Sequence, residues 1–99
     1  MNNLQRKIEI LTEFGAGEMI DSTISKLMTF QIARYRKVIT DIDDELKVFE
    51  QKYTMSSEEC YRRFNSGELG DEADFFEWTG LYENFLLYRK RMAMLKDEI

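Results

Sequence analysis

The sequence predicts an all-α protein, a long antiparallel coiled-coil-like helical hairpin with a short bridging helix. Two stretches repeat apolar residues every three and four positions without interruption, which is the heptad pattern of packed helices. The 99 residues include no proline, so nothing in the chain forces a long helix to break. Serine, aspartate and glycine residues between the two stretches supply helix start and stop signals. We expect one helical domain over residues 1–99.

Residues 1–17 form an N-terminal arm whose pattern is ambiguous. Apolar or β-branched side chains alternate at Ile8, Ile10, Thr12 and Phe14. The alternation favours a short strand over residues 4–14, although Leu4, Ile8 and Leu11 also match helical spacing. A single strand leaves its backbone groups unpaired, so a strand here would need a second copy or a partner to complete it.

Residues 18–54 are predicted to form the long helix. Its heptad seam consists of Met28, Ile32, Tyr35, Ile39, Ile42, Leu46, Phe49 and Tyr53. A second stripe through Leu27, Phe30 and Val38 widens the apolar face beyond a strict seam. A face of this width indicates burial against more than one neighbouring helix.

A short helix is predicted over residues 56–66. Ser56 as N-cap with Glu59 three residues later forms a capping box, and Gly67 is suited to a left-handed helix end. The only cysteine, Cys60, is expected to be a small buried side chain, because no histidine exists to activate it.

The C-terminal helix is predicted over residues 71–98, with Asp71 as its N-cap and Asp74 in its first turn. Its seam consists of Trp78, Leu81, Phe85, Tyr88, Met92, Leu95 and Ile99. Two seams of similar length joined by a short helix favour an antiparallel hairpin.

The apolar faces are wider than a two-helix hairpin can cover, which favours a homo-oligomer, most simply a dimer. The residues assigned to the oligomer seam are Ile32, Tyr35, Ile39, Ile42, Leu46, Phe49, Trp78, Leu81, Phe85, Tyr88 and Met92. Phe75, Phe76 and Tyr82 lie beside this seam, and we expect them to serve either an oligomer core or a partner site.

The charge is uneven along the chain. Fourteen basic and nineteen acidic residues give a net charge of −5, and residues 64–88 contain six acids and no base. Acids beside aromatic residues are typical of a docking surface for a basic protein. The predicted partner-binding residues are Glu68, Asp71, Asp74, Phe75, Phe76 and Tyr82.

Composition argues against most chemistry. Histidine, the commonest general base and metal ligand, is absent, and the acids do not follow the spacing of a calcium loop, so we expect no enzyme, no cofactor and no metal. Two basic clusters, at residues 34–37 and 89–91, leave a nucleic-acid role as a minority interpretation, because the net charge opposes it. No apolar run predicts a signal peptide or a membrane span, so we expect a cytoplasmic protein.

The segments 53–64, 67–71 and 74–78 together resemble a group of small prokaryotic helical proteins. Their pattern is a Tyr-Gly-Met-Ser-Ser-Glu-Glu-Phe-Tyr-Arg-Arg-Phe motif, a Gly-Glu-Leu-Gly-Asp link and a Phe-Phe-Glu-Trp helix. The chain departs from it at Thr54, where the pattern has glycine, and at Cys60, where it has phenylalanine. Such proteins look like the antitoxin-like partners of two-gene toxin–antitoxin modules.

The resemblance implies a non-enzymatic chain that neutralises a toxin, for which a basic ribonuclease is one candidate. The alternatives are a structural self-associating coiled-coil or adaptor protein and a DNA-binding autoregulator that uses the two basic clusters.

Overall fold

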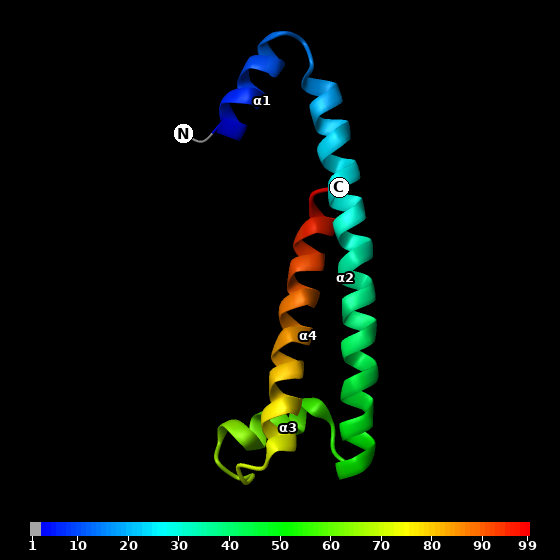
Figure 1. Ribbon diagram of the computed structural model, residues 1–99, viewed down its shortest axis with the longest axis vertical. Coiled ribbons are helices and arrows are strands. Elements are labelled where there is room, and N and C mark those ends of the chain that lie inside the picture. The colour runs from blue at the N-terminus through cyan, green and yellow to red at the C-terminus, as the bar shows by residue number, and fades with distance from the viewer. Residues whose placement is uncertain (1–2) are drawn as a thin grey trace.

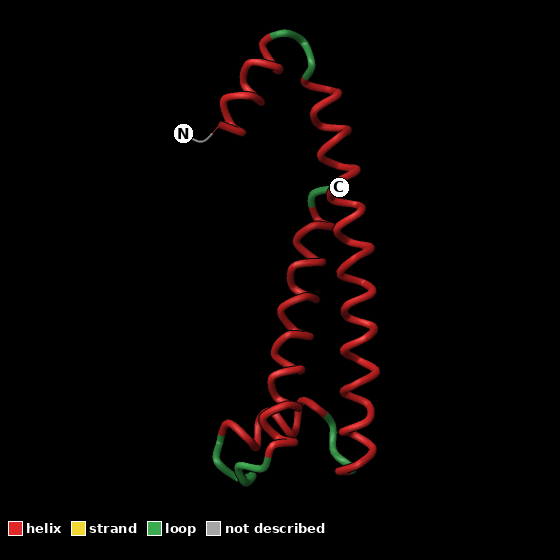
Figure 2. Tube along the Cα trace, in the orientation of Figure 1, coloured by secondary structure: helices red, strands yellow, loops and turns green. Residues whose placement is uncertain are grey.

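The computed structural model describes residues 3–99, which form helices and no strand. The helices are α1 (Asn3–Glu13), α2 (Gly17–Tyr53), α3 (Ser57–Asn65) and α4 (Ala73–Asp97). α2 and α4 run antiparallel side by side, α3 packs against α4 at one end, and α1 folds back along α2 at the other (Figures 1 and 2). The predicted all-α hairpin with a short bridging helix is confirmed. The molecule is elongated, with extents of 61 × 25 × 19 Å.

The expectation of a strand over residues 4–14 is wrong, because this segment is helix α1. A helix satisfies its backbone groups internally, whereas a lone strand cannot. α1 ends in a Schellman motif: Gly15 has φ 90°, its N–H donates to the Thr12 carbonyl, and the Ala16 N–H donates to the Leu11 carbonyl. The glycine therefore turns the chain back so that α1 lies along α2.

α2 ends in the same kind of motif, but with threonine at the left-handed position. Thr54 has φ 52° and ψ 50°, and the N–H groups of Thr54 and Met55 both donate to the Glu50 carbonyl. This conformation costs an L-residue roughly 1–2 kcal/mol. A glycine at this position would relieve that cost, so Thr54 introduces local strain into the turn.

Part of the capping predicted for the bridging helix α3 is present. The Ser56 Oγ accepts from the Glu59 N–H at 3.1 Å, and Gly67 closes the helix with φ 80°. The Glu59 carboxylate does not complete a capping box, because it pairs with arginines of its own helix. The prediction of Asp71 as the N-cap of α4 is also wrong: the cap is Glu72, without a side-chain hydrogen bond.

The hydrophobic core lies at the end where α2, α3 and α4 meet, which we call the closed end. Its buried residues are Ile42, Leu46, Cys60, Phe75 and Trp78. Trp78 and Cys60 are fully enclosed, and Phe49 stacks on the indole with ring centroids 5.6 Å apart. The core thus joins three helices at one end of a long molecule.

The residues assigned to the oligomer seam lie within the single chain, on α2 and α4. Ile32, Ile42, Leu46 and Trp78 are buried, and the remaining seam residues are half-buried. Tyr35 of α2 and Tyr88 of α4 meet with ring centroids 5.4 Å apart, which shows that the two seams face each other. Both seams therefore build the intramolecular hairpin, and their role between chains stays a prediction.

A chain of hydrogen bonds runs through the closed end and was not predicted. The Trp78 Nε1–H donates to Ser57 Oγ at 2.8 Å, and the Ser57 hydroxyl donates to Glu50 Oε2 at 2.7 Å. The Ser57 backbone N–H also donates to Glu50 Oε2, at 3.0 Å. One serine that is only 4% exposed therefore connects a residue of α2, the first turn of α3 and the buried indole of α4.

Substituting Ser57→Ala should lower the free energy of unfolding by about 2 kcal/mol, because the buried indole N–H loses its acceptor. Urea denaturation followed by circular dichroism measures this loss. Ser66→Ala is the matched control: its exposed hydroxyl donates only to the Arg63 carbonyl at the end of α3, so its effect should be much smaller. Equal denaturation midpoints for the two variants would contradict a central role for Ser57.

Candidate functional site

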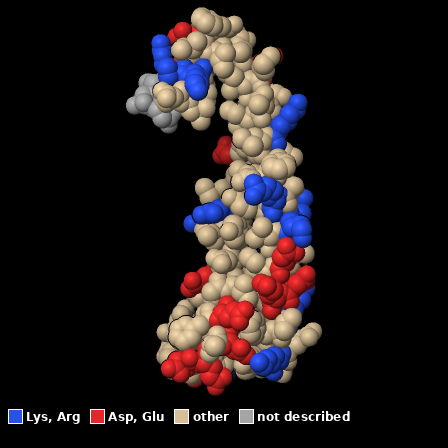
Figure 3. Space-filling model, in the orientation of Figure 1, with Lys and Arg blue, Asp and Glu red and all other residues tan. Residues whose placement is uncertain are grey.

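The most distinctive surface lies over α3, the link to α4 and the first turns of α4, where Figure 3 shows acidic side chains gathered at the bottom of the molecule. Its exposed acids are Glu58, Glu68, Asp71, Glu72, Glu77 and Glu83. Among residues 3–99, none of these six carboxylates forms an ion pair. We call these acids, together with Phe76, the acidic end.

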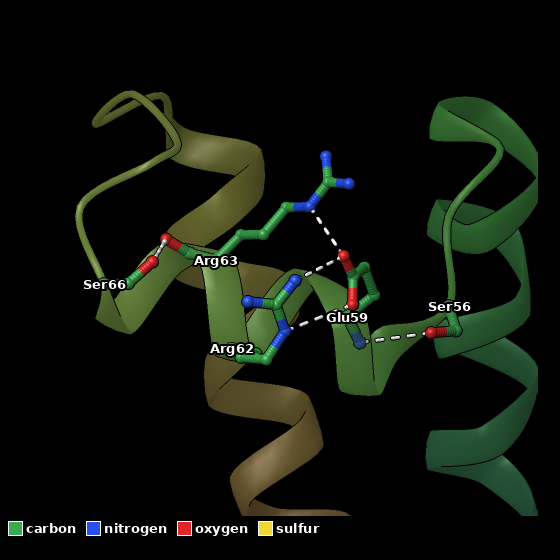
Figure 4. A network of polar contacts seen from close by, with 5 residues as sticks. All are labelled: Ser56, Glu59, Arg62, Arg63 and Ser66. Carbon is green, nitrogen blue, oxygen red and sulfur yellow. Dashed lines mark hydrogen bonds and ion pairs between the residues drawn. The ribbon is translucent and has the colours of Figure 1, made fainter.

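The arginines of α3 offset only a small part of this charge, because both pair with Glu59 (Figure 4). Arg62 Nη2 lies 2.6 Å and Arg63 Nε lies 2.8 Å from Glu59 Oε1. Hydrogen bonds from Arg62 and then Arg63 lower the pKa of the Glu59 carboxyl below its ordinary value. Glu59 thus offsets one of the two arginine charges within α3, and none of the six surrounding acids pairs directly with either arginine.

Asp74 was predicted to bind a partner, but its carboxylate is engaged within the chain. Asp74 Oδ2 accepts from Lys52 Nζ at 2.7 Å and from the Tyr53 hydroxyl at 2.6 Å. These two hydrogen bonds, from Lys52 first, lower the pKa of Asp74, and the bond to Asp74 raises the pKa of Tyr53 and of Lys52. Asp74 therefore fastens the start of α4 to the end of α2.

The stabilisation from Asp74 should depend on pH. Its pKa is lower in the folded chain than in the unfolded chain, so the contribution is present above pH ~4 and is lost as the pH falls through the folded-state pKa. Asp74→Asn should therefore destabilise the protein at neutral pH, and the difference from wild type should shrink in acid. Urea midpoints measured across this range test the trend.

Asp41→Asn serves as the control for this pH series. Asp41 pairs with Lys37 on the same helix, at 3.2 Å and with both side chains exposed, so its removal should cost less than removal of Asp74. A stability difference for Asp74→Asn that stays constant from neutral pH into acid would contradict the assignment.

Phe75, Phe76 and Tyr82 lie beside the predicted seam, and two of the three pack within the chain itself. Phe75 is 8% exposed, and its ring centroid lies 5.2 Å from that of Tyr53. Tyr82 is half-buried and packs against Tyr61 of α3, with centroids 5.4 Å apart. The bridging helix thus covers part of α4 that a two-helix picture leaves open, and Phe75 is not accessible to a partner.

Phe76 alone among these aromatics remains open to solvent. Its side chain is 58% exposed, and the edge-to-face contact with Phe64 of α3, at 5.1 Å between centroids, fixes its position. Glu68 and Asp71 of the predicted site lie in the link between α3 and α4, and both are exposed. An exposed aromatic ring that is held in place, on a surface whose acids form no ion pair, has the features of a docking surface for a basic protein.

The two predicted basic clusters lie at one level of the hairpin, as the contact between Tyr35 and Tyr88 requires. Their cations are Arg34, Arg36, Lys37, Arg89, Lys90 and Arg91, which we call the basic band. Within the described residues only Lys37 among these six has an acidic partner, Asp41. A groove of about 250 Å³ runs through the band and has Arg34 and Arg91 in its lining.

The remaining candidates for chemistry fit structural roles. Cys60 is completely buried, and burial raises the pKa of its thiol, which disfavours the reactive thiolate. Among residues 3–99 no three Cys, Asp or Glu side chains gather in a way that could hold a metal ion. The helices formed by these residues include none with the length and apolarity needed to cross a membrane.

The Glu50–Ser57–Trp78 chain of hydrogen bonds is the feature that sequence reasoning missed. The available signal was the single tryptophan, since a buried indole N–H needs an acceptor. Nothing in the spacing of Glu50 or Ser57 identifies either residue as that neighbour.

Comparison with models of known protein families, with curated proteins and with solved structures finds no significant match to this chain.

Proposed function

We propose that this chain is a non-enzymatic protein–protein interaction module, an antitoxin-like partner that binds and neutralises a basic toxin. The acidic end carries the proposal, because it combines six exposed carboxylates that form no ion pair with an exposed aromatic ring that is held in place. The carboxylates would attract and orient a basic protein, and Phe76 would be the apolar anchor in the contact. A basic ribonuclease has the charge that this surface complements.

The division of the motif residues supports the same proposal. Tyr53, Ser57 and Trp78 form contacts that hold the closed end together. The link residues Glu68 and Asp71, in contrast, have no ion pair among the described residues and face solvent. The motif shared with antitoxin-like proteins thus combines a rigid frame with an exposed acidic surface, as a docking protein requires.

The direct test is co-expression with the protein encoded by the neighbouring gene. We expect a complex that survives purification, weakens as salt is raised, and relieves any growth arrest that the neighbour causes when expressed alone. If the two proteins neither co-purify nor suppress toxicity, the antitoxin proposal is wrong. A chain that self-associates but binds no partner would instead be a structural coiled-coil protein.

Phe76→Ala locates the binding surface. Loss of an interface anchor costs about 2 kcal/mol or more, so the dissociation constant measured by calorimetry should rise about 30-fold. Val48→Ala is the control, since Val48 is 65% exposed on α2 and lies outside the acidic end. Unchanged affinity of the Phe76 variant for a proven partner would remove the acidic end as the docking site.

A second candidate function is DNA binding by the basic band, which an antitoxin could use to regulate its own gene. Five of the six cations in the band lack an acidic partner within the described residues, and they come from two adjacent helices. This local concentration of charge is what phosphate binding needs, even though the net charge of the chain is −5.

The salt dependence of DNA affinity tests this candidate. Each lost phosphate contact should reduce the slope of log K against log salt by about 1, so Arg34→Ala and Arg91→Ala should each flatten the slope. Lys47→Ala is the control, because Lys47 pairs with Asp43 outside the band. Absence of binding at low salt, or equal slopes for all three variants, would exclude the band as a DNA site.

A further inference from the structure

The part of the molecule farthest from the core has no buried residue of its own. We call residues 3–30, which comprise α1 and the first turns of α2, the N-terminal hairpin; every residue in it is exposed or half-buried. Among residues 3–99, more than half of the large exposed apolar side chains lie here, namely Leu4, Leu11, Phe14, Met19, Ile24, Leu27 and Phe30. The segment is therefore rich in exposed apolar side chains.

A helix in this position needs a cover. α1 has 11 residues and buries none of them, and helices shorter than ~12–15 residues are marginal in water without tertiary packing. Between α1 and α2 lies an open groove of about 380 Å³, whose lining is almost wholly apolar and includes Ile8, Leu11 and Ile20. A helix from another molecule laid along this groove would complete the packing that the chain lacks.

The surface area of the chain matches the requirement of a dimer. The accessible surface is 7534 Å², whereas a compact monomer of 11.9 kDa exposes about 5,900 Å². The excess of roughly 1,600 Å² per chain is about twice the ~800 Å² that each partner contributes to a standard stable interface. The elongated chain therefore has more than enough excess surface for a standard interface between two copies.

The charge distribution is compatible with a second copy of the chain as the partner, and it favours contact through the N-terminal hairpin. The N-terminal hairpin has three basic and four acidic residues, a net charge of −1, so two copies of it repel little. The acidic end and the basic band each carry one sign, so contact with themselves would be repulsive. Of the three surfaces, the N-terminal hairpin is therefore the one whose contact with its own copy is least opposed by charge.

The same charges favour an antiparallel pair. If the two hairpins overlap over residues 17–30, the basic bands of the two copies lie roughly 35 Å apart along the helices, at 1.5 Å per residue. That separation exceeds the ~8 Å screening length at physiological ionic strength several-fold. In a parallel pair, by contrast, the two bands would lie side by side.

We propose that residues 3–30 are a homodimerisation surface, at which two copies pack their N-terminal hairpins antiparallel into a four-helix arrangement around a two-fold axis. Both acidic ends and both basic bands then point away from the interface. The proposal is independent of the proposed function, because no residue of the acidic end takes part in it.

The test is sedimentation equilibrium of the full chain over a wide concentration range. We expect a dimer for the wild type. Association should be weakened at least ~10-fold by Leu27→Asp and by Met19→Asp, because each substitution places a charge on both faces of the interface. Val48→Asp is the matched control, because its side chain is 65% exposed against 62% for Leu27 and lies on the same helix beside the closed end. It should remain dimeric.

A monomeric wild type at all concentrations overturns the proposal, as does a Leu27→Asp variant that dimerises like Val48→Asp. Circular dichroism confirms that each variant retains its helices, since these side chains are exposed in the single chain. Small-angle scattering then distinguishes the arrangements. The antiparallel dimer should have a maximum dimension of about 100 Å at 1.5 Å per overlapping residue. A dimer close to the 61 Å length of the single chain would exclude the antiparallel overlap.

Discussion

The structure depends on one buried hydroxyl group. The Ser57 Oγ accepts from the indole of Trp78 and donates to the Glu50 carboxylate, which places α4, α3 and α2 in fixed relation. Enclosing the indole without an acceptor for its N–H would cost free energy, and the enclosed indole is packed where α2, α3 and α4 meet. The position of α3 follows from this arrangement, and with it the shape of the acidic end.

The character of the surface changes along the length of the molecule. The closed end combines the core with an acidic exterior, the middle carries unpaired cations, and the N-terminal hairpin is apolar and nearly neutral. Glu59 contributes to this separation because it pairs with both arginines of α3 and offsets one of their two charges without help from another helix. The local ion pairs thus affect the net charge of each surface more than they add to the free energy of unfolding.

The long elements could be predicted because their information is local. Heptad spacing fixes the facing sides of α2 and α4, and Ser56 and Gly67 fix the ends of α3. The prediction for the N-terminal arm was wrong because its eleven residues match both the strand period and the helix period. The structure resolves this: the segment is helical, and the chain turns back at Gly15. The role of Asp74 was also out of reach, because its partner Lys52 is 22 residues away and neither side chain has a periodic signature.

The placement of the core has a consequence for the order in which the chain folds during synthesis. Trp78 and its neighbours on α4 follow α1 and α2 along the chain, and domains cannot close before their core residues have emerged. α1 and most of α2 are therefore outside the ribosome while the closed end is still incomplete. The first tertiary contacts available to a nascent chain are therefore those of its N-terminal hairpin.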